Sequence, residues 1–126
     1  MDDQKKKILI VDDEPDLAFM MKVCLQANGF QIEQASDGSI GLQKIRSFQP
    51  DLVLLDVVMP KMDGWEFYKY VRNDADPKIN QIPIIMMTAL LPVGKVNSLE
   101  MMHDPILIKP FKEEDLLKII KSTMER

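Results

Sequence analysis

The sequence predicts an α/β fold in which a parallel sheet carries helices on both faces. Apolar runs alternate with stretches of helical periodicity about five times along the chain, the order expected of a parallel sheet. The runs at 7–12, 51–56 and 82–88 are nearly continuous in apolar residues, as in strands that are buried on both faces. A chain of 126 residues is long enough for one core, so we expect a single domain over 1–126.

The first half of the chain holds two predicted strand–helix units. After the strand at 7–12, Pro15 suits the first turn of a helix, and Asn28-Gly29 ends that helix. The segment 30–35 alternates apolar and polar side chains, which predicts a short strand at the edge of the sheet. A second helix then ends before Pro50.

The second half begins with the central strand, 51–56. A helix is predicted over 65–72, and the polar stretch 73–81 is interpreted as a surface connection because it carries Pro77. The strand at 82–88 follows.

The last third is less regular. Helical spacing persists through 90–103, but Pro92 and Gly94 weaken the start of any helix there. A short strand, Ile106–Ile108, and an amphipathic helix, Glu113–Met124, complete the pattern.

Composition limits the function classes. A net charge of −4 and a pI near 5.0 disfavour direct nucleic-acid binding. The one cysteine, Cys24, lies in an apolar helical pattern, which predicts a buried thiol and no internal disulfide. No apolar run is long enough to span a membrane, and the first residues do not form a signal peptide. We therefore expect a cytoplasmic protein without membrane insertion.

Polar residues end four of the predicted strands: Asp12-Asp13, Asp56, Thr88 and Lys109. Parallel strands have their carboxyl ends at one edge of the sheet, so these groups should converge. Each group alone would most simply be structural or solvated; together they predict a site.

The chemistry of this set favours phosphoryl transfer. Clustered carboxylates need a compensating cation, and oxygen ligands alone favour Mg²⁺. Asp56 is then the candidate nucleophile, and Asp12 and Asp13 are the better metal ligands. Thr88 and Lys109 would contact the phosphoryl oxygens.

These residues resemble the receiver (CheY-like) domain of two-component response regulators along almost the whole chain. The matching motifs are Ile8-Leu-Ile-Val-Asp12-Asp13-Glu14, Asp51-Leu-Val-Leu-Leu-Asp56, Met59-Pro60, Asp63-Gly64, Thr88-Ala89 and Lys109-Pro110-Phe111. The resemblance implies a flavodoxin-like, doubly wound sheet of five parallel strands in the order 2-1-3-4-5, with five flanking helices.

The resemblance also implies roles for single residues. Asp56 would accept a phosphoryl group from a sensor histidine kinase or a phosphotransfer protein. Asp13, Asp56 and the backbone carbonyl of Val58 would bind Mg²⁺ directly, and Asp12 would assist through water. Catalysis would be limited to the domain's own phosphorylation and dephosphorylation.

By the same resemblance, Thr88 and Lys109 would contact the phosphoryl group, and the Lys109–Pro110 peptide bond would be cis. The changed surface would bind a downstream protein that the sequence does not identify. Weak homodimerisation is a further alternative.

Two departures from the family pattern carry further expectations. Ile106 stands where the family usually has an aromatic residue, and 102–105 replaces a small turn, so we expect a short or irregular fourth helix. Val58 and Leu90 flank the phosphoryl site in this fold and neither orients an attacking water, which predicts slow self-dephosphorylation.

The main alternative is a Mg²⁺-dependent phosphatase with an aspartate nucleophile, such as a haloacid dehalogenase. That class has its nucleophile on the first strand and usually a cap insertion. A flavodoxin would need a phosphate-binding loop where Asp12-Asp13-Glu14 stands. A receiver-fold binding module that works without phosphorylation is the third alternative.

Overall fold

The computed structural model describes residues 5–57, 64–88 and 105–125. Five parallel strands form one sheet in the order β2-β1-β3-β4-β5. The strands are β1 (Lys7–Val11), β2 (Gln31–Ala35), β3 (Leu52–Asp56), β4 (Ile84–Thr88) and β5 (Ile106–Ile108). The predicted fold class and strand order are confirmed, and β2 lies at an edge as its alternating pattern predicted.

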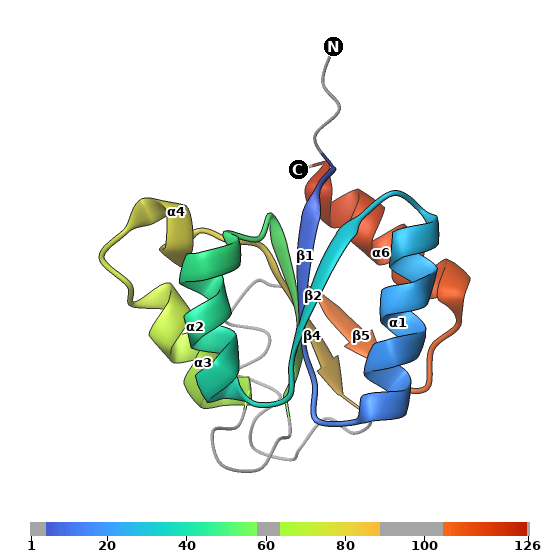
Figure 1. Cartoon of the computed structure of the whole chain (residues 1–126), viewed down its shortest axis with the longest axis horizontal. Helices are drawn as coiled ribbons and strands as arrows, with labels where there is room; N and C mark the ends of the chain where they lie inside the picture. The colour runs from blue at the N-terminus through green and yellow to red at the C-terminus, as the bar shows by residue number, and fades with distance from the viewer. Residues whose placement is uncertain (1–4, 58–63, 89–104, 126) are drawn as a thin grey trace.

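Helices cover both faces of this sheet (Figure 1). One face carries α1 (Pro15–Ala27) and α6 (Glu113–Met124); the other carries α2 (Gly38–Phe48), α3 (Gly64–Arg72) and the short α4 (Pro77–Asn80). The described part of the chain begins and ends at the end of the sheet where the strands begin (Figure 1). The carboxyl ends of the strands lie at the bottom of that view.

The strands supply two cores because successive side chains point to opposite faces. On β1, Ile8 and Ile10 pack with α1 and α6, whereas Leu9 and Val11 pack with α2 and α3. Every residue of β3 and β4 is buried, which is why their sequences are almost wholly apolar.

The stretch 73–81 differs from its prediction as a surface connection, since it contains the helical turn α4. Asp76 caps this turn by accepting a hydrogen bond from the backbone N–H of Lys78. Pro77 occupies the first helical position, where a missing N–H costs nothing, so it begins a helix here and does not prevent one.

The described residues contain five helices, but α4 is not the expected fourth helix. That helix was predicted within 90–103, which lies outside the described residues. In the part of the chain that the structure describes, no helix has the length and apolarity needed to cross a bilayer.

Candidate functional site

The carboxyl ends of four strands place the predicted polar residues at one edge of the sheet. Asp12 directly follows β1, Asp56 and Thr88 are the last residues of β3 and β4, and Lys109 directly follows β5. Ladder hydrogen bonds extend past the strand ends: the Asp12 N–H donates to the Ala35 carbonyl (3.0 Å), and the Lys109 N–H donates to the Thr88 carbonyl (2.8 Å). The sheet register therefore fixes where these side chains begin.

Lys109 joins the strand ends electrostatically. Its Nζ lies 3.4 Å from Asp12 Oδ2 and 3.4 Å from Asp56 Oδ2, so one ammonium spans the ends of β1 and β3. A shorter contact, 2.9 Å, joins the same ammonium to Glu14 Oε1. The Lys109 side chain is 11% exposed, so these interactions are only partly screened by solvent.

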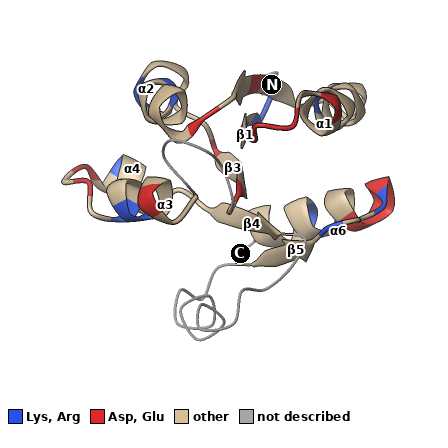
Figure 2. Cartoon of the chain, turned by 90° about the horizontal axis from the view of Figure 1, so that it is seen from below, with Lys and Arg blue, Asp and Glu red and all other residues tan. Residues whose placement is uncertain are grey.

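Three carboxylates at this edge meet the requirements of a cation site. Asp12, Asp13 and Asp56 each offer a carboxylate oxygen, and these oxygens lie within 4.8 Å of one another. Asp12 and Asp56 are buried, while Asp13 is exposed and leaves the cluster open to solvent. In Figure 2 acidic residues lie at the ends of β1 and β3. An all-oxygen, anionic set of this kind fits Mg²⁺.

Burial sets the ionisation of Asp12. Removal from solvent raises the pKa of its carboxyl above the ordinary value of 3.8, although a hydrogen bond from the Glu14 N–H (2.9 Å) and the Lys109 charge oppose the rise. An additional positive charge beside Asp12 would therefore favour the ionised form of its carboxyl.

The surroundings of Lys109 favour its charged form. Burial by itself would lower its pKa, but the hydrogen bond to Glu14 and the charges of Asp12 and Asp56 outweigh burial and raise the pKa above 10.5. Lys109 is therefore a permanent cation at neutral pH, as a group that neutralises phosphoryl oxygens must be.

Gly64, the first residue of α3, lets that helix begin directly against the end of β3. A Cβ atom at this position would lie 2.4 Å from the Asp56 carbonyl oxygen and 2.6 Å from the Val57 Cα. The Gly64 N–H donates to the Val57 carbonyl (2.9 Å), which ties the two segments together. Backbone contact, which only glycine permits, thus positions the residue after the nucleophile candidate.

The structure brings together Asp12, Asp13, Asp56 and Lys109, and it places a buried Thr88 at the end of the neighbouring strand. The Lys109–Pro110 peptide bond is cis, as the resemblance implied. Val58, Leu90 and the segment 102–104 lie outside the described residues.

Sequence reasoning missed the contact between Glu14 and Lys109. Glu14 follows the acidic pair directly, but just before the first residue of a helix an acid has an ordinary explanation in the helix dipole. Nothing in its spacing indicates that it meets a lysine ninety-five residues further along the chain.

Comparison with known proteins identifies the family. Residues 8–121 match the response regulator receiver domain. The chain belongs to the response regulator receiver family. Its fold matches the Vibrio cholerae chemotaxis protein CheY4 with a TM-score of 0.86 at 33% identity, covering 95% of this chain and 99% of that one. A putative response regulator from Chloroflexus aurantiacus matches equally well, with 31% identity over 98% of this chain and 100% of that one.

Longer relatives carry a similar receiver domain. The DNA-binding response regulator MtrA of Mycolicibacterium smegmatis is 37% identical over all of this chain and 54% of its own length. The probable transcriptional regulator ycf27 of Pyropia yezoensis is 38% identical over all of this chain and 50% of its own length. The receiver domain described here thus spans about half the length of the curated relatives it matches, and it is a signalling domain of the two-component type.

Ile106, which replaces the usual aromatic residue of receiver domains, begins β5 opposite Met86. Its side chain is half buried and packs against the core that lies beneath α2 and α3. In this receiver domain the position contributes to the core.

Proposed function

We propose that Asp56 accepts a phosphoryl group from a phosphohistidine on a partner protein, and that this modification changes the surface presented to a downstream protein. The observation that carries the proposal is the contact between Lys109 and Asp56 (3.4 Å) inside a cluster of three carboxylates. A nucleophilic carboxylate, a permanent cation and an oxygen-rich metal site then surround one point.

In the proposed transfer, an Asp56 carboxylate oxygen attacks phosphorus. The new oxygen–phosphorus bond forms as the bond from phosphorus to the donor's imidazole nitrogen breaks, and the electron pair leaves with that nitrogen. Lys109 neutralises charge on the phosphoryl oxygens, and the Thr88 hydroxyl donates a hydrogen bond to one of them. Mg²⁺ held by Asp13 and Asp56, with Asp12 assisting, would neutralise the remaining oxygens.

Catalysis in this proposal is confined to the domain's own phosphorylation and dephosphorylation. The partners we infer are a histidine kinase or phosphotransfer protein upstream and a protein downstream. The net charge of −4 argues that the receiver domain does not itself contact nucleic acid. Slow dephosphorylation, expected from Val58 and Leu90, stays a prediction from the sequence.

The test uses a small phosphodonor with Mg²⁺ and intact-mass measurement before and after exposure. We expect wild type to gain one phosphoryl group, Asp56→Asn to gain none, and Asp51→Asn to behave as wild type. Asp51 is a matched control because its carboxylate lies at the other end of β3, where it accepts a hydrogen bond from the Lys7 backbone N–H. A phosphoryl gain that persists in Asp56→Asn would contradict the assignment.

A further inference from the structure

The closest described ion-pair contact of Lys109 is with a residue that the phosphoryl-transfer scheme does not use. Glu14 Oε1 lies 2.9 Å from the Lys109 ammonium, against 3.4 Å for the carboxylates of Asp12 and Asp56. The Glu14 side chain is 58% exposed, whereas that of Lys109 is 11% exposed. A carboxylate on the rim of the site therefore holds the partly buried cation in the resting state.

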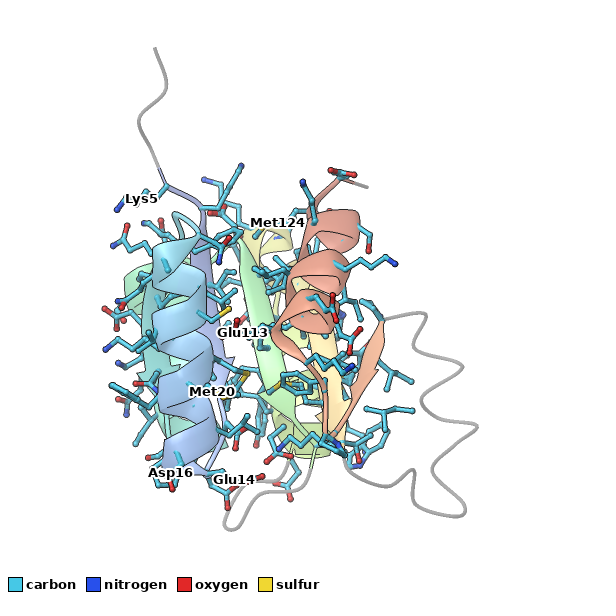
Figure 3. All side chains as sticks on the ribbon, turned by 90° about the vertical axis from the view of Figure 1, so that its right-hand side faces the viewer. Lys5, Glu14, Asp16, Met20, Glu113 and Met124 are labelled. Atoms are coloured by element: carbon cyan, nitrogen blue, oxygen red, sulfur yellow. The ribbon has the colours of Figure 1, made fainter. Side chains whose placement is uncertain are left out.

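The local backbone directs Glu14 to this contact. Glu14 is the N-cap residue of α1, a position that favours short side chains able to bond the first free N–H groups of the helix. Its side chain makes no such capping bond. Its backbone N–H is instead tied to Asp12 Oδ1 (2.9 Å), which fixes Glu14 beside the acidic pair. Figure 3 shows Glu14 at the lower end of α1, at the edge where the strands finish.

A phosphoryl group on Asp56 would compete with Glu14 for the same ammonium. An attached phosphoryl group carries close to two negative charges at neutral pH, about twice that of the Glu14 carboxylate. To bind phosphoryl oxygens, Lys109 must weaken its contact with Glu14, and the Glu14 charge also repels the incoming group.

We propose that Glu14 is a positioning residue that holds Lys109 away from its phosphoryl-binding position, so that its carboxylate slows phosphoryl uptake by Asp56 and weakens the binding of phosphoryl-like anions. The inference rests on the proposed function. Because the Glu14 carboxylate is largely exposed, we expect neutralising it to change rates and affinities by about twofold to fivefold.

The experiment compares wild type, Glu14→Gln and Asp16→Asn. Glutamine retains the shape of the Glu14 side chain and removes its charge. Asp16 is a matched control because it is another exposed acid in the first turn of α1, and it forms none of the ion pairs found among the described residues. The two labelled side chains lie at the same end of the helix in Figure 3.

Two quantities are measured in the presence of Mg²⁺. The first is the half-saturating concentration of beryllofluoride, a phosphoryl stand-in, followed by the fluorescence of Trp65. Trp65 is the chain's one tryptophan and is buried beside Gly64 in α3. The second is the initial rate of phosphorylation by a small phosphodonor, followed by intact mass.

We expect Glu14→Gln to bind beryllofluoride about twofold to fivefold more tightly and to be phosphorylated faster by a similar factor, with a clearly smaller change in Asp16→Asn. Loss of a merely structural role would loosen the site and weaken binding, so tighter binding separates the two explanations. Raising the salt concentration should shrink the difference from wild type.

Equal changes in the two variants would overturn the inference, since they would report general charge and not the contact with Lys109. Weaker binding by Glu14→Gln would overturn it as well. Either result leaves the proposed function intact when wild type is phosphorylated on Asp56. Failure of wild type to accept a phosphoryl group or bind beryllofluoride would instead remove the proposed function, and the inference with it.

Discussion

The two ends of the sheet differ in how their charged groups are compensated. At the end where the strands begin, charged groups meet partners that satisfy them. The Lys7 backbone N–H donates to Asp51 Oδ2 (2.8 Å), and the Lys7 ammonium donates to the Phe48 carbonyl (3.2 Å). The Arg72 guanidinium donates to the carbonyls of Asn80 (3.0 Å) and Ile82 (2.7 Å), which fastens α3 to the segment leading into β4.

At the end where the strands finish, negative charge is in excess. Among the described residues the carboxylates of Asp12, Asp56 and Glu14 share the single ammonium of Lys109, and Asp13 lies close by. Burial raises the pKa of Asp12 despite that ammonium, so the compensation is incomplete.

Contacts that stabilise the fold and groups of the candidate site therefore lie at opposite ends of the same sheet. Complementary contacts at the amino ends of the strands need nothing from outside. At the acidic end the described carboxylates outnumber the ammonium, and an added dication would offset the excess. Binding sites commonly sacrifice local stability in this manner. The comparison predicts that substitutions at the acidic end depend on Mg²⁺ and that those at the other end do not.

The largest effect on the free energy of unfolding is expected when one cationic side chain is removed at each end of the sheet. Without Mg²⁺, Lys109→Met should lower the free energy of unfolding by about 3 kcal/mol, because it removes the ammonium that contacts the buried carboxylates of Asp12 and Asp56. Urea denaturation with a chelator measures this loss. Mg²⁺ should restore part of it, since a dication compensates the same carboxylates.

Arg72→Met is the matched control at the opposite end. It should cost about 1–2 kcal/mol through two lost hydrogen bonds, whether or not Mg²⁺ is present. A Mg²⁺ dependence of equal size in both variants would contradict the contrast between the two ends.

Asp12→Asn is expected to change the free energy of unfolding less than Lys109→Met does, and to raise it. In the presence of a chelator at neutral pH it should raise the free energy of unfolding by about 1 kcal/mol, because it removes a buried charge and retains the acceptor for the Glu14 N–H. It should also weaken the stabilisation by Mg²⁺, which thermal unfolding with and without the ion would measure.

The pH dependence of this gain follows from the raised pKa of Asp12. Burial makes the folded state bind a proton more readily than the unfolded state, whose carboxyl has the ordinary pKa of 3.8. The cost of the charge is fully present above the folded pKa and is relieved as the pH falls through that value toward 3.8. The advantage of Asp12→Asn should therefore shrink in mildly acidic buffer; an advantage that grows there would contradict burial as the cause.

The smallest effect is expected from Gln49→Gly at the amino ends of the strands. Gln49 follows α2 with φ 54° and ψ 62°, the left-handed region that suits glycine. Relief of this strain, offset by the entropy that glycine loses on folding, should stabilise the protein by about 0.5 kcal/mol. The gain should be the same with and without Mg²⁺ in thermal unfolding, and a dependence on the ion would count against the separation of the two ends.

Sequence patterns predicted the sheet and most of the site for a common physical reason. Strands buried on both faces must be apolar throughout, so a charged residue such as Asp56 stands out at the end of its run. Since parallel strands end at one edge, Asp12, Asp56 and Lys109 could be brought together before any coordinates were known. Their contacts in the structure bear out that convergence.

Other features depend on information that periodicity does not contain. The 2.9 Å contact between Glu14 and Lys109 depends on the directions of two long side chains, which no spacing rule specifies. The turn α4 was missed because the polar stretch 73–81, which contains Pro77, was interpreted as a surface connection. Asp76 supplies a cap, and a proline is favourable at the first helical position that follows it.

Gly64 has a consequence for any survey in which every position of the domain is substituted. Each of the other nineteen amino acids would place a Cβ atom against the Asp56 carbonyl and the Val57 Cα, so even alanine would force β3 and α3 apart. Such a survey would rank Gly64 beside Asp56 and Lys109, as though it took part in the proposed phosphoryl transfer. Its importance would come from occupying almost no volume, and a genetic screen that equates intolerance with catalysis would misassign it.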